Sequence, residues 1–275
     1  MTTRQKQILT ALIDEYIETA RPVASQILAK KFGLSSATLR LELANLMEQG
    51  LVARPHISSG RVPTDKAYRW YIKNLHQVSE IAEPEKEYLN KQIQGGQDDR
   101  QLTQSLVRAL AQMTNNLSFS LVDDDFFESG LSQLLHQPEF TDYELVLGVS
   151  QIFDTADQIM ANLMRDFTDI DNDVNIFIGS EGPMRRLPYY SLLSSRYQLP
   201  TGQQGVVAML GPKRMDYQRN IALLNYASQL LNSVNELTSC ELCFIVMLNT
   251  CVKLILSADE NKKDCLWHCV EDSLV

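Results

Sequence analysis

The stretch that decides the fold of the N-terminal part is residues 15–72, which read EYIETARPVASQILAKKFGLSSATLRLELANLMEQGLVARPHISSGRVPTDKAYRWYI. Apolar residues at helical spacing predict two short helices, one on each side of the turn Gly33-Leu34-Ser35. Gly33 supplies the left-handed conformation that ends the helix before the turn, and Ser35 or Ser36 caps the helix after it. The expected buried sides are Val23, Ile27, Leu28 and Phe32 before the turn, and Leu39, Leu43, Leu46 and Met47 after it.

The segments on both sides of this helix pair complete a small domain. Upstream, an amphipathic helix begins near Thr2 or Thr3, either of which can cap it, and ends near Arg21-Pro22. Downstream of Gly50, two β-prone pieces around Ser58-Ser59-Gly60 predict a small edge hairpin. Asp65 is expected to cap a fourth helix that continues to Leu75. This order is that of a winged helix-turn-helix domain.

In such a domain the second helix of the pair enters the major groove of DNA, while the hairpin reaches the backbone or the minor groove. The outward side of that helix combines Arg40, which suits guanine, with Leu41, which can contact a thymine methyl group. Arg61 is expected to be the cation that the hairpin inserts into a groove. The candidate DNA-binding residues are Ser35, Ser36, Thr38, Arg40 and Leu41 in the helix, His56, Ser58, Ser59 and Arg61 in the hairpin, and Lys66 after it.

Charge supports a nucleic-acid partner for this part of the chain. The whole chain has a formal net charge of -9, but its first 75 residues carry 11 basic and 6 acidic side chains. A local positive face is what phosphate contact needs. Helix-turn-helix patterns also serve as protein-binding or structural modules, in which Arg40 and Arg61 would be solvated surface charges.

The remainder of the chain predicts an α+β domain behind a linker. Residues 79–100 are rich in charge and contain Pro84 and Gly95-Gly96, so we expect a linker with some helix in it. Residues 101–238 mix helical and strand patterns. The expected elements are a helix with Leu102, Leu106, Leu110, Met113 and Leu117 inward, a strand at 118–122, a long helix at 142–165, strands at 174–178, 189–199 and 205–210, and a last helix at 216–237.

At these residues the sequence resembles the heat-inducible transcription repressor HrcA family of bacteria. The run quoted above follows the family pattern closely, including PHISSGRVPT in the hairpin, and QPEF, VNIFIGSEGP and GVVAMLGPKRMDYQRNIALLNYASQLL resemble its C-terminal GAF-like domain. The resemblance covers roughly residues 1–237. It implies a winged helix at residues 1–78, a GAF-like sensing and dimerisation domain at 101–238, and a dimeric repressor of chaperone genes. Such a repressor binds an inverted-repeat operator and is kept active by the chaperonin.

The sequence departs from the family pattern at two places. Leu41 stands where family members usually have Asn, and only Asn can pair with adenine through two hydrogen bonds, so a different operator base is expected. Family members also usually place a longer segment, with strands and a dimerising insertion, before QPEF. Here a short acidic stretch, residues 122–128, occupies that place, so the geometry of the dimer and the response to the chaperonin are open.

Other chemistry has little support in the sequence. Neither the Rossmann nor the Walker spacing occurs, and there is no G-x-S-x-G motif, so we expect no enzymatic activity and no cofactor. The acidic residues 123–125 are expected to be a solvated loop. In the tail, residues 239–275, four side chains have a spacing that zinc can use, although idle thiols are the default: Cys240, Cys243, Cys265 and His268.

Composition places the protein in a reducing cytoplasm. The N-terminus lacks the unbroken apolar run of a secretion signal, and all five cysteines lie between positions 240 and 269, where they cannot staple the remainder of the chain. The longest apolar stretch, residues 242–256, is interrupted by polar residues and is too short for a bilayer, so no membrane partner is expected.

The sequence therefore predicts a cytoplasmic, dimeric transcriptional repressor of stress genes. Two other functions stay open. One is a regulator that responds to a small molecule held by the GAF-like domain, and the other is a protein-interaction module that has lost DNA binding.

Overall fold

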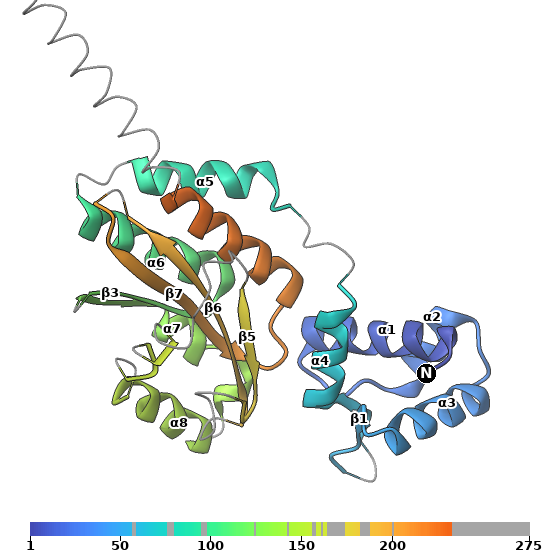
Figure 1. The fold of residues 1–275 in the computed structure, drawn as a ribbon. Helices are drawn as coiled ribbons and strands as arrows, with labels where there is room; N and C mark the ends of the chain where they lie inside the picture. The colour runs from blue at the N-terminus through green and yellow to red at the C-terminus, as the bar shows by residue number, and fades with distance from the viewer. Residues whose placement is uncertain are drawn as a thin grey trace, which may run out of the picture.

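The structure is a computed structural model in which a helical N-terminal part lies beside a sheet covered by helices on both faces (Figure 1). The residues that it describes are 1–56, 59–75, 80–94, 98–123, 125–141, 143–155, 158–160, 162–163, 174–181, 188–199 and 201–232.

The N-terminal part is a winged helix-turn-helix, as predicted. Thr2 and Gln5 form a capping box at the start of the first helix, Gly33 ends the second at a φ of 62°, and the Ser35 hydroxyl caps the third. Two antiparallel strands then form the wing. The elements are α1 (Thr3–Thr19), α2 (Ser25–Phe32), α3 (Ser36–Glu48), β1 (Val52–Ala53), β2 (Val62–Pro63) and α4 (Asp65–Lys73).

Two details of this part differ from the expectation. Ile27 is exposed rather than buried, because Leu28 is the residue of α2 that faces the core and its neighbour points about 100° away from it. The cap of α4 is the Thr64 side chain, which accepts the backbone N–H of Ala67, so Asp65 is the first residue of that helix. A carboxylate in the first turn is still favourable there because of the helix dipole.

The C-terminal part is an α+β domain built on a five-stranded antiparallel sheet in the order β4-β3-β7-β6-β5. Its strands are β3 (Leu117–Val122), β4 (Asp125–Ser129), β5 (Asn175–Ile178), β6 (Tyr190–Gln198) and β7 (Gln204–Pro212). Its helices are α5 (Glu83–Gln94), α6 (Asp99–Thr114), α7 (Leu131–Leu135), the 3₁₀ helix η1 (Pro138–Thr141), α8 (Tyr143–Phe153) and a helix at 217–232.

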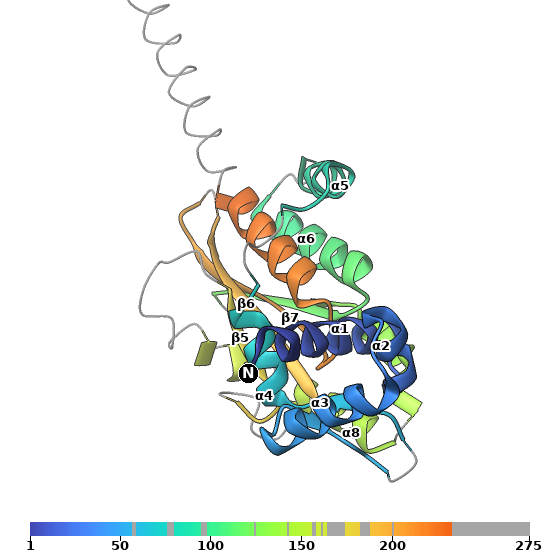
Figure 2. The ribbon, with the colours of Figure 1, turned by 90° about the vertical axis from the view of Figure 1, so that its right-hand side faces the viewer.

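Alternating strand residues face two separate apolar clusters. Val207 and Met209 of β7 pack with α5, α6 and helix 217–232, whereas Val206 and Ala208 pack with α7 and α8 on the other face. Figures 1 and 2 show these two helical layers with the sheet between them. The strands expected at 174–178, 189–199 and 205–210 are confirmed as β5, β6 and β7.

Three expectations for this part were wrong. The long helix at 142–165 is interrupted, since α8 ends at Phe153 and a turn follows. Leu117 begins β3 instead of ending the preceding helix, and residues 125–129 form the strand β4. The segment expected as a linker with some helix in it does hold a helix, α5, but Leu89 and Ile93 are buried in the same cluster as α6, so the segment is part of the packed domain and not a linker.

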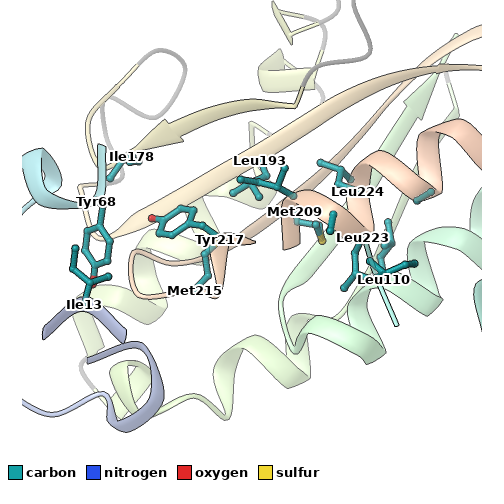
Figure 3. Packing of buried hydrophobic residues seen from close by; sticks show 14 of the residues in the cluster. Ile13, Tyr68, Leu110, Ile178, Leu193, Met209, Met215, Tyr217, Leu223 and Leu224 are labelled. Carbon is teal, nitrogen blue, oxygen red and sulfur yellow. The ribbon is translucent and has the colours of Figure 1, made fainter. Parts of the chain in front are cut away.

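The winged helix and the sheet domain share one apolar cluster. Ile13 of α1 and Tyr68 of α4 lie beside Met215 and Tyr217, which follow β7 (Figure 3). The ring centroids of Tyr68 and Tyr217 are 5.7 Å apart. Burial of apolar side chains from both parts holds the two parts together.

Charged groups complete this junction, and two of them are consecutive in sequence. Lys213 pairs with Asp65 at the start of α4, while Arg214 pairs with Glu139 and donates to the carbonyl of Ile17 near the end of α1. Gly179 has a φ of 59°, and a Cβ there would lie 2.5 Å from a carboxylate oxygen of Asp65. Only glycine therefore allows this approach.

Candidate nucleic-acid interface

The exposed side of α3 is the surface predicted to read DNA bases. Arg40 is exposed, and Leu41 is 64% exposed although it is a large apolar side chain. Ala37 and Ala44 are exposed on the same side. Their side chains are small, so they leave Arg40 and Leu41 accessible. The opposite side, with Leu39, Leu43 and Leu46, is buried as predicted.

The N-terminus of α3 is capped by side-chain hydroxyl groups. The Ser35 side chain accepts the backbone N–H of Thr38 at 3.1 Å, and the two hydroxyl oxygens are 2.8 Å apart. Ser35 and Thr38 thus hold the start of the helix. Ser36, which is half-buried, is the third hydroxyl at this end, where the helix dipole favours a phosphate.

The wing is anchored to the segment between α1 and α2. Val23 and Arg61 exchange two backbone hydrogen bonds of 2.8 Å, which adds a third short chain to the β1–β2 pair. A Cβ at Gly60 would lie 2.5 Å from the carbonyl oxygens of Pro22 and Val23. The glycine is therefore needed for the packing of the wing onto the segment between α1 and α2.

The tip of the wing is held by Ser59. Its hydroxyl accepts the backbone N–H of His56 at 2.9 Å and donates to the carbonyl of the same residue at 2.8 Å. The His56 side chain is exposed. Ser58, another candidate DNA contact, lies outside the described residues. Ser59 shapes the turn, and His56 is the accessible side chain beside it.

The accessible cation of the wing is Arg54, which the sequence reasoning missed. Arg61 is half-buried, and its Nε is buried without a hydrogen-bond partner among the described residues. Burial, and then the nearby charge of Arg54, lower the pKa of the Arg61 guanidinium. Arg54 is exposed, with its Nε 3.4 Å from the Ser59 carbonyl oxygen. Its position directly before PHISSGR in the sequence could have indicated that it belongs to the wing.

Lys66 lies at the opposite end of α3 from the serines. Its ammonium group donates to the carbonyl of Gln49 at 2.8 Å, just past the last residue of the helix. A cation at a helix C-terminus stabilises the carbonyl groups that have no helical partner. Lys66 therefore ties α4 to α3, and it retains further N–H donors for a phosphate.

The other candidate sites are not part of this surface. Cys240, Cys243, Cys265 and His268 lie outside the described residues. Within the described ranges, no group of three or more His, Cys, Asp or Glu side chains is arranged to hold a metal ion. Asp123 is in the β3–β4 turn, Asp125 pairs with Arg100 at 3.4 Å, and Asp124 is not described.

No helix in the described part of the chain is long and apolar enough to cross a membrane.

Two family models match the chain. The model described as winged helix-turn-helix transcription repressor, HrcA DNA-binding, matches residues 1–77, and the HrcA protein C-terminal domain matches residues 69–221. The chain belongs to the HrcA family. The two matched regions correspond to the winged helix and to the sheet domain that follows it in the structure.

Curated relatives and a solved structure agree with this assignment. The chain is 26% identical to the heat-inducible transcription repressor HrcA of Geobacter sulfurreducens and 24% identical to that of Thermodesulfovibrio yellowstonii, over 86% and 85% of this chain and 98% of each relative. A crystal structure described as a hypothetical protein has a TM-score of 0.62 and 18% identity, and covers 85% of this chain and 98% of its own. It supports the fold alone.

The alignments also show that this HrcA chain is short. The alignment with the Geobacter sulfurreducens protein runs over 339 positions, but 86% of this chain is only about 237 residues. About 100 positions of that relative therefore have no counterpart here. The shorter segment before QPEF that the sequence pattern indicated stays a prediction of where they are missing.

Proposed function

We propose that this protein represses chaperone genes by binding an inverted-repeat operator as a homodimer. The observation that carries the proposal is the open side of α3, with Arg40 and the exposed Leu41, in a domain of the HrcA DNA-binding type. The wing and both ends of α3 lie around this side and can contact the flanking backbone. A two-fold dimer would place two such helices in successive major grooves.

The proposed DNA contacts fall into two classes. Arg40 and Leu41 read base edges, because guanine offers two acceptors to Arg and thymine offers a methyl group to Leu. The residues with phosphate-contacting or supporting roles are Ser35, Ser36, Thr38, Arg54, His56, Ser58, Ser59, Arg61 and Lys66. Ser35, Thr38 and Ser59 also hold local backbone, so they position the neighbouring donors. Phosphate contacts orient the protein, and base contacts select the sequence.

Repression would follow from occupancy of the operator, without a catalytic step. We assign residues 1–78 to DNA binding and 101–238 to sensing and dimerisation, with α5 packed on α6 of the second part. Heat or loss of the chaperonin would lower the population of the binding-competent dimer. A repressor of bacterial chaperone genes acts in the cytoplasm, where the chromosome lies.

A second candidate is a regulator that responds to a small molecule. The observation that favours it is a cavity of about 730 Å³ between the two parts of the molecule. A protein-interaction module without DNA binding is the alternative that the following experiment separates from the proposal.

The proposal is tested by the salt dependence of binding to duplex DNA. Each neutralised phosphate releases condensed cations, so the affinity of the full chain should fall steeply between dilute and physiological salt in spite of the net charge of -9. A fluorescence anisotropy titration at several salt concentrations measures the slope. Binding that does not depend on salt would remove DNA as the partner and favour the protein-interaction module.

A further inference from the structure

A polar cavity lies at the junction between the winged helix and the sheet domain. Its volume is about 730 Å³, which is within the range of small-molecule sites. Ile17 of α1 lines it on one side, and the ends of α6 and α7, the loop after β7 and the start of helix 217–232 line it on the others. A molecule bound here would therefore contact both parts of the repressor.

Two buried carboxamides in the wall have unused hydrogen-bonding groups. Asn220 is 3% exposed, and its side chain has no partner among the described residues. Asn116 is 2% exposed, and although its Oδ1 lies 3.5 Å from Gln137 Nε2, its own Nδ2 has no partner in the same part of the chain. Neither side chain has an atom among the fully buried, unpartnered polar atoms of the described residues, so the free amide atoms are open to the cavity, where a polar occupant can bond to them.

The cations of the wall are already neutralised. Both Nε and Nη2 of Arg214 bond to Glu139, and Nε and Nη2 of Arg219 lie 2.8 and 2.7 Å from one carboxylate oxygen of Glu85. Asp216 is a third charge, and its Oδ1 caps the helix at the Arg219 N–H. With both arginines paired within the protein and Asp216 adding a negative charge, the wall offers no excess positive charge to a phosphate or carboxylate.

The remaining wall groups suit a flat, uncharged ligand. The Nδ1 of His136 lies 2.6 Å from the Ser132 carbonyl oxygen, and Gln133 is half-buried with no partner among the described residues. Ile17, Pro138 and Met215 contribute apolar surface. Carboxamides pair with the edge of a nucleobase through a donor and an acceptor together, while apolar side chains cover its faces.

We propose that this cavity binds an uncharged nucleobase or nucleoside, which Asn220 and Asn116 recognise by hydrogen bonds to the base edge. The ligand would contact Ile17 and Arg214, the two groups joined across the junction. It would stabilise the arrangement in which α3 is exposed. On the proposed function described above, it would therefore act as a co-repressor that raises DNA affinity.

The test uses the full chain and four probes, adenosine, guanosine, cytidine and uridine, with AMP as the charged comparator. Binding is followed by the melting temperature and by isothermal titration calorimetry, and neither readout requires DNA. We expect a saturable rise in melting temperature with at least one nucleoside, and no tighter binding of the matching phosphate. No saturable binding of any nucleoside, or a clear preference for AMP, would overturn the proposal.

Variants place the binding in the cavity. Asn220→Leu should weaken binding by about tenfold or more, since a buried hydrogen bond is lost. Gln133→Ala, at a half-buried position in the cavity wall, should also weaken it. The matched control is Asn225→Leu, because Asn225 lies on the same helix outside the cavity and its buried Oδ1 also lacks a partner among the described residues. Undiminished binding in Asn220→Leu and Gln133→Ala, or equal losses in the control, would overturn the site.

A separate experiment tests whether the bound nucleoside changes the affinity for DNA. The bound nucleoside should raise the affinity of the wild-type chain for a DNA pool, and Asn220→Leu should abolish that rise. An unchanged or lowered DNA affinity with the nucleoside bound would overturn the co-repressor role. Failure to bind DNA at all would count against the proposed function, and the nucleoside titration would still decide the cavity.

Discussion

The Nη1 of Arg214 donates to the main-chain carbonyl oxygen of Ile17 at 3.2 Å, which joins the sheet domain to the last turn of α1. Carbonyl groups in the last turn of a helix lack partners within the helix, and a cation there also opposes the helix dipole. The same guanidinium is held by Glu139 of η1. The orientation of the DNA-reading domain therefore depends on a side chain of the other domain.

Arg214→Met should lower the free energy of unfolding by about 2 to 4 kcal/mol, because Glu139 would lose the partner of a mostly buried ion pair. The side chains of Arg214 and Glu139 are 15% and 24% exposed. Urea denaturation of the full chain measures the change. The control is Arg219→Met, whose pair with Glu85 involves a 43% exposed arginine and should contribute about 0 to 1 kcal/mol. Equal losses in the two variants would contradict the account of Arg214.

Gly60→Ala should destabilise the winged helix by about 1 to 3 kcal/mol, since the new Cβ would overlap the carbonyl oxygens of Pro22 and Val23. DNA affinity should fall with it, because the wing would move away from Val23. Urea denaturation and anisotropy measure the two effects. His56→Ala, on the exposed tip of the same wing, should leave stability within about 0.5 kcal/mol. A Gly60→Ala variant as stable as the wild type would show that the wing is not packed in this way.

Arg54→Ala should reduce the slope of log affinity against log salt concentration by about 1, as expected for the loss of one phosphate contact. Arg61→Ala should change the slope less, because the Arg61 side chain is half-buried and its Nε faces the interior. Anisotropy titrations at several salt concentrations give both slopes. The reverse order of the two effects would restore Arg61 as the wing cation that contacts DNA.

Arg40→Ala should cost about 1 to 3 kcal/mol in operator binding and relax selectivity at one base position. Lys66→Ala should instead weaken all sequences alike, because the ammonium group lies at the end of α3 against the Gln49 carbonyl. Competition with random DNA separates the two effects. Equal losses on operator and random DNA for Arg40→Ala would make it a phosphate contact only.

Leu41→Asn should change the preferred base at one symmetric pair of operator positions. The amide can pair with adenine through two hydrogen bonds, a discrimination of about 1 to 3 kcal/mol, whereas leucine can only contact a thymine methyl. Because Leu41 is 64% exposed, the melting temperature should be unchanged. An identical selected motif for both proteins would remove residue 41 from the base-reading set.

The sequence was most informative where local chemistry decides the structure. The capping residues Thr2 and Ser35, the helix end at Gly33 and the buried side of α3 were all predictable, because short-range rules act on a few neighbouring residues. The strands β5, β6 and β7 were predictable from apolar runs between turn residues. Once the buried side of α3 is known, the opposite side must be the exposed one.

The remaining features depend on contacts that are distant in sequence. The charge, Pro84 and Gly95-Gly96 of residues 79–100 predict a linker with some helix in it, yet Leu89 and Ile93 of α5 are buried by packing on α6. The burial of Arg61 results from the bridge to Val23, 38 positions earlier in the numbering. Likewise, the sequence does not indicate that Arg214 would reach Ile17, or that a cavity would form beside them.

The most direct test of the account is the selection of bound sequences from a random duplex pool with the full chain. We predict an enriched palindrome of two half-sites separated by one helical turn or a multiple of it, because a two-fold dimer presents two copies of α3. The Arg40→Ala variant should lose the preference at one position of each half-site. A pool with no enriched sequence, or one enriched in a single half-site without symmetry, would contradict a dimeric operator-binding repressor.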